Sequence, residues 1–180
     1  MENRYFIAVI PPENIYNQIV SIKKDISLKY NSYAALKSPP HVTLHMPFNL
    51  ANHKEKKFLH AIETWKLNIT PIEIELKNYS SFEPRVIFIN VNKSNSLCNL
   101  QDTVIDFMKR EFNIFNQAED LRGFHPHITI AFRDLKKNNF YAAMKEYSDA
   151  KYESNFLCNS IHVLKRFDAE WISIKEIKFC

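Results

Sequence analysis

A five-residue pattern that carries an imidazole and a hydroxyl occurs twice in this chain. It reads PHVTL at residues 40–44 and PHITI at residues 126–130. The β-branched and aliphatic residues favour a strand in both places. Because side chains alternate between the two faces of a strand, His41 and Thr43 point to one face while their aliphatic neighbours point to the core. Two strands would then each present a titratable ring and a hydrogen-bonding hydroxyl to whatever lies between them.

The repetition of this pattern argues against coincidence. The chain has seven histidines and five threonines among 180 residues. A His-x-Thr triplet is therefore expected by chance roughly 0.2 times, which is the false-positive rate for judging the motif. A single copy could be a half-buried strand histidine with a purely structural role. Two copies with matching flanks favour a functional pair.

The doubled motif resembles that of the two-histidine (2H) phosphoesterases, in particular the bacterial branch named for RNA 2′,5′-ligase and RNA 2′,3′-cyclic phosphodiesterase. Residues 5–12 (YFIAVIPP) are similar to the family's first strand and the turn into its first helix. Residues 82–88 (FEPRVIF) are similar to its central strand, and residues 124–127 (FHPH) to the approach to its second motif. The resemblance implies an enzyme that opens 2′,3′-cyclic phosphate ends of RNA or small nucleotides, or that splits or joins 2′,5′ linkages.

Two histidines suit this chemistry. Cleavage of a cyclic phosphodiester needs one group that takes a proton from water and another that gives a proton to the leaving oxygen, on opposite sides of the phosphorus. An imidazole can do either, because its unperturbed pKa of about 6.5 lies near neutral pH. Threonine hydroxyls can donate hydrogen bonds to the non-bridging oxygens, where charge develops. The scheme requires no metal and no other cofactor.

The resemblance also implies a role for each motif residue. His41 matches the first-motif histidine, which donates a proton to the leaving oxygen, and His127 matches the second, which activates water. Thr43 and Thr129 match the hydroxyls that bind the phosphate. The two sites are near mirror images, and the reverse reaction exchanges the roles of the histidines.

Three further residues are candidates for substrate contact. His45 shares a strand face with His41 by parity, and His125 directly precedes the second motif. Many relatives carry an arginine five residues after the second histidine; that position is Phe132 here, and Arg133 follows it. By strand parity Arg133 lies on the face of the second-motif histidine, unless a bulge intervenes.

Two other interpretations use the same atoms. Four imidazoles in one cleft, from His41, His45, His125 and His127, could hold Zn²⁺ or Cu²⁺. However, no acidic residue adjoins either motif, and the threonines would have no role as ligands. The second is a nucleotide- or RNA-binding module without turnover. A pure binder has no need of two titrating groups, and arginine and aromatic residues would serve it better.

Composition narrows the class of protein. Hydrophobic residues make up 46% and charged residues 24%, as expected for one globular domain over residues 1–180. The only glycine, Gly123, excludes glycine-rich phosphate loops. A net charge of +4 suits nucleotides or RNA ends as substrates. Three scattered cysteines indicate neither disulfides nor a zinc site, and no signal peptide or membrane segment is recognisable, so we expect a cytoplasmic monomer.

The first elements alternate between strand and helix. Residues 4–10 predict a buried strand, and the following Pro-Pro-Glu predicts the start of a helix with an isoleucine stripe toward the core. The first motif strand is expected to end at Pro47, which cannot continue a ladder. Asn52 and Glu55 predict the capped start of a second helix.

The rest of the chain continues this alternation. Residues 72–77 alternate like a half-exposed strand, and residues 85–91 are apolar on both faces, like a central strand. Next come a third helix with Leu97, Leu100, Val104 and Phe107 inward, a polar loop at 116–122, the second motif strand, a fourth helix, and closing strands at 156–166 and 170–179.

The order of the elements predicts an α+β fold. Each half of the sequence delivers one motif, so the halves are expected to be related lobes that face each other. The resemblance implies two pseudo-symmetric lobes, each an antiparallel-rich sheet with flanking helices, with the active-site cleft between them.

Overall fold

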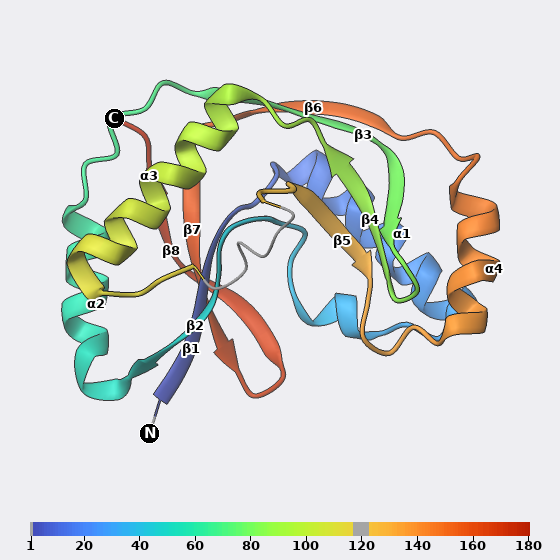
Figure 1. Ribbon diagram of the computed structural model, residues 1–180, viewed down its shortest axis with the longest axis horizontal. Helices are drawn as coiled ribbons and strands as arrows, with labels where there is room; N and C mark the ends of the chain where they lie inside the picture. The colour runs from blue at the N-terminus through green and yellow to red at the C-terminus, as the bar shows by residue number, and fades with distance from the viewer. Residues whose placement is uncertain (1, 117–122) are drawn as a thin grey trace.

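Two four-stranded antiparallel sheets form the framework of the computed structural model, which describes residues 2–116 and 123–180 (Figure 1). The first sheet has the order β2-β1-β7-β8 and consists of Val42–Ala51, Glu2–Val9, Ser160–Phe167 and Glu170–Lys178. The second has the order β5-β4-β3-β6 and consists of His127–Ala131, Val86–Val91, Ile72–Phe82 and Glu153–Cys158. The motif strands β2 and β5 are therefore both edge strands. Most of the predicted polar loop, residues 117–122, lies outside the described residues.

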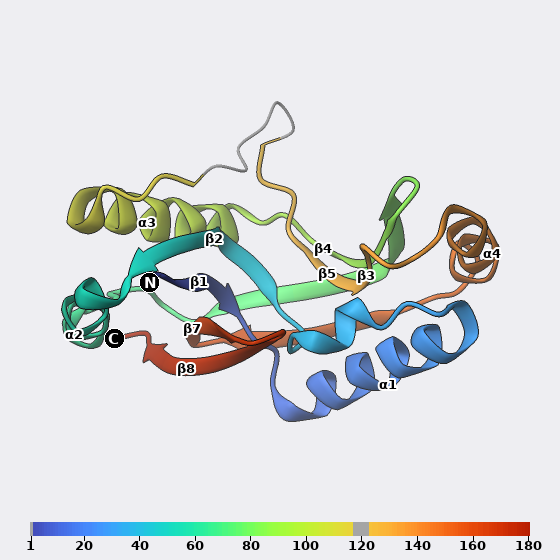
Figure 2. The same cartoon turned by 90° about the horizontal axis from the view of Figure 1, so that it is seen from below.

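Helices cover one face of each sheet. They are α1 (Glu13–Tyr30), α2 (Glu55–Thr64), α3 (Asn95–Phe112) and α4 (Lys137–Tyr147), with short 3₁₀ turns η1 (Ala34–Lys37) and η2 (Asn52–Lys54). Helices α2 and α3 pack on the first sheet, and α1 and α4 pack on the second. Figure 2 shows α3 and α1 on opposite faces of the layered strands.

The two lobes exchange elements along the chain. The first sheet combines the N-terminal strands β1 and β2 with the C-terminal strands β7 and β8. Helix α1 follows β1 of the first sheet but packs on β5 of the second, and α3 follows β4 of the second sheet but packs on β2 of the first. The predicted α+β fold with two antiparallel lobes is confirmed. The expectation that each half of the sequence forms one lobe is wrong, because helices and closing strands are exchanged.

An internal repeat relates the two lobes. The units β1-α1-β2 and β4-α3-β5 each contain an 18-residue helix followed by a motif strand. Both helices end at an asparagine in the left-handed conformation, Asn31 with φ 54° and Asn113 with φ 56°. Asparagine tolerates this conformation better than other residues with a Cβ, so it can stop a helix where glycine is absent.

Three local predictions are wrong for identifiable reasons. Strand β2 continues through Pro47 to Ala51, because it is an edge strand whose pairing with β1 is already interrupted by register shifts. The predicted strand at 156–166 is divided at Asn159 into β6 and β7, which join different sheets. Asn52 begins the turn η2 rather than capping a helix, and α2 has no side-chain cap.

The motif strands contribute to one hydrophobic core. The aliphatic residues of both motifs are at most 1% exposed, as the alternation predicts: Val42, Leu44, Ile128 and Ile130. They belong to a single cluster that also contains buried side chains from α1, α2, α3 and α4. The two lobes are therefore joined by continuous packing beneath the motifs.

A matched pair of leucines tests the inner face of the second sheet. Leu76 on β3 is 2% exposed, whereas Leu157 on the neighbouring strand β6 is 64% exposed. Leu76→Ala should lower the free energy of unfolding by about 2–5 kcal/mol, because it leaves a cavity in the core. Leu157→Ala should change it by less than about 0.5 kcal/mol. Urea unfolding measures both values, and equal losses would contradict the assignment of the inner face.

Candidate active site

The two edge strands bring the motifs together. His41 directly precedes β2, and His127 is the first residue of β5. Strands β2 and β5 contact each other where the sheets meet. The histidine and threonine of each motif, including Thr43 and Thr129, are half-buried, whereas the residues between them are buried. The predicted catalytic and phosphate-binding side chains thus lie on the side of the motif strands that faces away from the core.

Both motif histidines are held in the same way. Nδ1 of His41 lies 2.7 Å from the carbonyl oxygen of Pro39, and Nδ1 of His127 lies 2.7 Å from that of His125. A carbonyl oxygen can only accept, so Nδ1 carries the proton in both rings. In the neutral ring the lone pair is then on Nε2. Nε2 is therefore the nitrogen of each histidine that can exchange a proton with a ligand.

The proline of each motif accounts for this arrangement. A residue before proline is restricted to extended conformations by contact with the proline ring. In both motifs the acceptor carbonyl belongs to that restricted residue, which precedes Pro40 or Pro126. The signal for the hydrogen bond was therefore present in the sequence, as the proline in front of each histidine.

Aromatic rings from the central strands pack on both imidazoles. The ring centroid of Phe6 on β1 lies 4.7 Å from that of His41, and the centroid of Phe88 on β4 lies 4.9 Å from that of His127. On the first side the wall extends further, because the ring of Trp171 packs edge-on against Phe6 at 4.7 Å. These rings remove water from one side of each histidine.

The surroundings disfavour a charge on either motif histidine. Burial lowers the pKa of His41 to about 4, and the nearby positive charges of Lys23 and His127 act in the same direction. Burial likewise lowers the pKa of His127, with a contribution from His125. Without a bound anion both rings are neutral at pH 7. An anion between them would favour their protonated forms and raise both pKa values.

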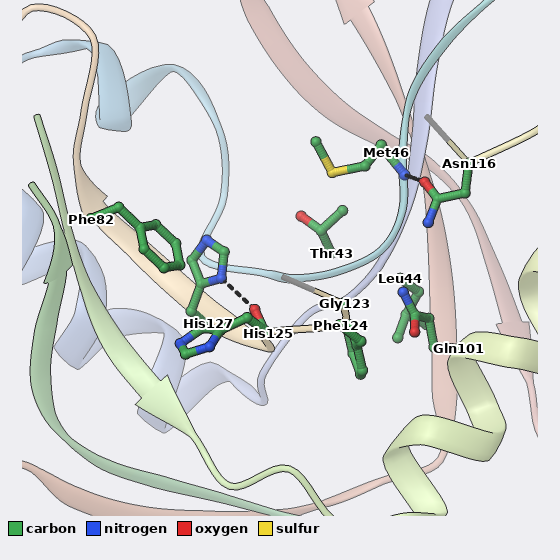
Figure 3. A pocket seen from close by; sticks show the side chains of 10 residues that line it. All are labelled: Thr43, Leu44, Met46, Phe82, Gln101, Asn116, Gly123, Phe124, His125 and His127. Atoms are coloured by element: carbon green, nitrogen blue, oxygen red, sulfur yellow. Dashed lines mark hydrogen bonds between the residues drawn. The ribbon is translucent and has the colours of Figure 1, made fainter. Parts of the chain in front are cut away.

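A cavity of about 430 Å³ opens beside the second motif. Its walls include Thr43 from the first motif and His127 from the second, together with His125, Phe82 and Asn116 (Figure 3). The side chain of Asn116 accepts a hydrogen bond from the backbone N–H of Met46 at 3.0 Å, which ties this wall to β2. None of the described lining residues is acidic. The cavity therefore offers hydroxyl and imidazole groups to an anion, and none of its described lining residues carries a carboxylate that would repel the anion.

His45 does not share the face of His41, contrary to the parity argument. Register shifts in the pairing of β1 with β2 place Ile7 opposite His45 and the adjacent Ala8 opposite Thr43. His45 is consequently fully buried, with its ring edge-on to Phe48 at 5.3 Å. It does not line the cavity, so the four-imidazole constellation considered for a metal does not form.

Arg133 does not follow strand parity either. Strand β5 ends at Ala131, and Arg133 has a left-handed backbone with φ 59°. Its side chain is exposed, and its guanidinium lies 5.0 Å from the ring centroid of Phe132. His125, by contrast, is exposed and lines the cavity, as its place before the second motif suggested.

Two charged residues that sequence reasoning missed hold the segment before the first motif. Lys23 on α1 is 2% exposed and donates hydrogen bonds to the carbonyls of Ala35 at 3.1 Å and Ser38 at 3.0 Å. Asp134, just after the second motif strand, accepts from the Ser32 hydroxyl and from the backbone N–H groups of residues 33 and 34. The only signal for Lys23 was its position within the isoleucine stripe of α1.

Comparisons with known proteins identify the family of the chain. The model of the 2′-5′ RNA ligase superfamily matches residues 11–170. The chain belongs to that superfamily. A "Putative phosphoesterase" of Geobacillus kaustophilus is 31% identical over 137 residues, covering 73% of this chain and 70% of that protein. One of Staphylococcus aureus is 25% identical, with 96% of each chain covered.

Solved structures show the same fold. Escherichia coli LigT complexed with 3′-AMP superposes with a TM-score of 0.68 at 17% identity, covering 99% of both chains. Thermus thermophilus TT0787 superposes with a TM-score of 0.65 at 16% identity, covering 98% of this chain and 97% of that one. These structures share only the fold, whereas the family match and the curated relative confirm the predicted family, the 2H phosphoesterases.

The family assignment leaves a metal site and a membrane segment open. Over residues 2–116 and 123–180, no cluster of three or more His, Cys, Asp or Glu side chains could hold a metal ion. Over the same ranges, no helix is both long and apolar enough to cross a membrane.

The carbonyl hydrogen bonds predict the tautomer of each family histidine. Both His41 and His127 should carry the proton on Nδ1 and leave Nε2 unprotonated in the neutral protein. Two-dimensional ¹⁵N–¹H correlation spectra at pH 7.5 measure this, with His→Gln variants to assign the signals. His162 is a useful reference, because its Nδ1 faces the Ser173 hydroxyl at 3.0 Å and a hydroxyl imposes no tautomer. An Nε2–H tautomer for either motif histidine would contradict the geometry.

Proposed function

We propose that this 2H phosphoesterase hydrolyses 2′,3′-cyclic phosphate ends of RNA or small nucleotides by general acid–base catalysis, without a required metal. Cleavage or joining of 2′,5′ linkages is the alternative reaction of the same site. In this proposal residues 1–180 act as one two-lobed domain, as a cytoplasmic monomer. The observation that carries it is the matched pair of Nδ1–carbonyl hydrogen bonds at His41 and His127. Support for a nucleotide substrate comes from the similar fold of LigT, which was solved with 3′-AMP.

The reaction uses the two imidazoles in opposite senses. One neutral ring takes a proton from water on Nε2 as the water oxygen attacks phosphorus. The other ring, protonated, gives its Nε2 proton to the leaving ribose oxygen as that P–O bond breaks. A cyclic diester thereby becomes a monoester beside a free hydroxyl. Thr43 and Thr129 donate hydrogen bonds to the non-bridging oxygens as their charge increases.

The electrostatics favour His41 as the base, which is opposite to the role that the family resemblance implies. The pKa of His41 is lowered to about 4 by burial and by two positive neighbours, Lys23 and His127. The ring of His127 lacks the lysine influence, and only His125 adds to the effect of burial on its pKa. When the phosphate anion enters, the first proton therefore goes more easily to His127. His41 then starts neutral and activates water.

Turnover assays with two substrate classes test the proposed reaction. Protein treated with EDTA should convert 2′,3′-cyclic nucleotides to monoesters, and the same assay with 2′,5′-linked oligonucleotides tests the alternative. Absence of turnover for both would contradict the enzyme proposal. If the His41→Ala, His127→Ala double variant then bound RNA as tightly as the wild type, the result would favour a binding module without turnover over the enzyme. Loss of activity with EDTA and its return with Zn²⁺ would favour a metal site.

The pH profile and variants test the roles of the motif residues. The profile of kcat/KM should be bell-shaped, with both apparent pKa values belonging to the coupled pair. His41→Ala and His127→Ala should each lower kcat/KM at least about a hundredfold, or about 2.7 kcal/mol, and the double variant should lose little more. Thr43→Ala and Thr129→Ala should cost less, because water partly replaces a hydroxyl. His53→Ala, an exposed change on η2, is the control.

A lysine variant assigns the base. The acidic limb of the profile reports the group that must be deprotonated. Lys23→Met removes a positive charge near His41, so the pKa of His41 should rise and the acidic limb should move to higher pH. An unmoved acidic limb would instead assign the base to His127. A flat profile between pH 5 and 9 would contradict both assignments.

A further inference from the structure

A second cavity, of about 580 Å³, lies between α1, η1 and β8. We call it the α1 cavity; its walls include Lys23 and Lys24 from α1, Lys37 from η1, Pro39 from the following loop, and Trp171 from β8. It shares no described lining residue with the cavity of Figure 3. Figure 2 shows α1 and β8 on the side of the molecule opposite α3. The α1 cavity touches the active site through Pro39, whose carbonyl holds His41.

The back wall of the α1 cavity contains a buried cation without a counter-ion. Lys23 is 2% exposed and gives two of its three ammonium N–H groups to backbone carbonyls. Within the described part of the chain it forms no ion pair, and its third N–H has no protein acceptor. A buried charge is costly unless it is paired. Burial accordingly lowers the pKa of Lys23 to about 7. An anion in the cavity would remove this cost.

The rim of the α1 cavity is complementary to a nucleotide. Lys24 and Lys37 are exposed, and Glu170 is the single acidic residue among the described lining residues. Trp171 is half-buried, with its ring braced by Phe6. An aromatic face can stack on any base, and lysines bind phosphate as point charges. The volume is in the range of small-molecule sites.

We propose that the α1 cavity is a nucleotide-binding subsite in which Lys23, Lys24 and Lys37 hold a phosphate group and Trp171 stacks on the base. A further part of this proposal rests on the proposed function: the nucleotide in the α1 cavity is then the neighbouring nucleotide of an oligonucleotide whose cyclic phosphate reacts at His41. The preferred substrate is then an oligonucleotide with a cyclic phosphate end rather than a cyclic mononucleotide. The binding itself does not depend on turnover.

Fluorescence of Trp171 tests the subsite directly. The chain has two tryptophans, and Trp65, at the end of α2, stacks on Phe107 of α3, so Trp65→Phe leaves Trp171 as the reporter. Adenosine 5′-monophosphate should change the signal of this variant saturably, and adenosine should bind at least about tenfold more weakly. Thr129→Ala, a change in the motif site, should leave the dissociation constant unchanged. Equal affinity for the nucleotide and the nucleoside would overturn the phosphate site.

Lysine variants in the same background locate the phosphate. Lys24→Ala and Lys37→Ala are surface changes that should fold normally, and each should weaken binding of the nucleotide about fivefold, as loss of about 1 kcal/mol does. Lys56→Ala, an exposed change on α2 with the same loss of charge, is the matched control and should have no effect. If neither cavity lysine mattered more than Lys56, the subsite would be overturned.

Proton uptake tests the role of Lys23. At pH 8 its ammonium is largely deprotonated, because its pKa is about 7, and a bound phosphate would recharge it. Calorimetric titration in two buffers of different ionisation enthalpy should show uptake of up to about one proton per nucleotide bound. The other titratable groups around the cavity are Tyr16, Lys24, Lys37 and Glu170, with His41 beyond Pro39. Uptake that survives in Lys23→Met would overturn the assignment to Lys23.

Kinetics separate this subsite from the proposed reaction. The Lys24→Ala, Lys37→Ala double variant should raise the KM for a trinucleotide with a 2′,3′-cyclic phosphate end. This increase should be about tenfold larger than the increase in KM for the cyclic mononucleotide. Equal effects on both substrates would overturn the continuation of the chain into the cavity. If neither substrate turned over, the proposed function would fail, while the binding results would still decide whether the subsite exists.

Discussion

The hydrogen bond from Nδ1 of each motif histidine to a carbonyl two residues earlier is the interaction on which the rest of the site depends. It fixes the tautomer, the ring orientation and the nitrogen that is available to a ligand. Such a bond is only as well placed as the carbonyl that accepts it. Much of the surrounding structure can be understood as support for the carbonyls of Pro39 and His125. The proline that follows Pro39 or His125 restricts the backbone of that residue, and packing around each segment further fixes the position of the carbonyl.

Support for the first carbonyl comes from both lobes. Lys23 holds the segment from the side of α1, and Asp134 holds its beginning from the end of the second motif strand. Asp134 accepts hydrogen bonds from three groups at residues 32–34, which lie 100 to 102 positions earlier in the chain. The segment that leads to His41 is therefore hydrogen-bonded to the segment that follows the strand of His127. Exchange of α1 and α3 links the lobes in the same way, because each helix follows a strand of one sheet and packs on the motif strand of the other.

The sequence predicted what depends on local pattern and missed what depends on register and long-range contact. Alternation placed Val42 and Ile128 in the core, and the helical stripe placed Ile15 and Ile19 there too, because burial dominates these positions. The error at His45 arose from two register shifts between β1 and β2, which interrupt the alternation only locally, because Phe48 and Leu50 are buried with the same parity as Val42 and Leu44. No pattern within β2 alone reports such a shift.

The charged supports were equally inaccessible to local patterns. Lys23 falls among isoleucines in a helix, where a lysine would ordinarily extend its amine to solvent. Its burial is explained only by the two carbonyls that meet it, and these belong to a turn 12 to 15 residues later. Likewise, Asp134 follows an exposed arginine with no sign of its partners near residue 33. The exchange of helices and strands between the lobes could not be predicted from the sequence. Each half contains a complete strand–helix–strand unit, which would fit an arrangement with one lobe per half equally well.

The proposed selectivity for anions rests on how this chain distributes its charges. The fold places a lysine and two motif histidines in surroundings that disfavour their charged forms, as the lowered pKa values of Lys23, His41 and His127 indicate. Carboxylates would relieve this most simply, yet Asp134, the carboxylate that holds the segment before the first motif, is engaged by a hydroxyl and two backbone N–H groups. The relief is thus left to a ligand. A phosphate gains from charging groups that the protein alone keeps neutral, whereas a neutral molecule of the same shape gains nothing from them. In the proposed reaction, recognition of the anion and protonation of the histidine pair are therefore one event, because the anion that binds also raises the pKa of the ring proposed to donate a proton.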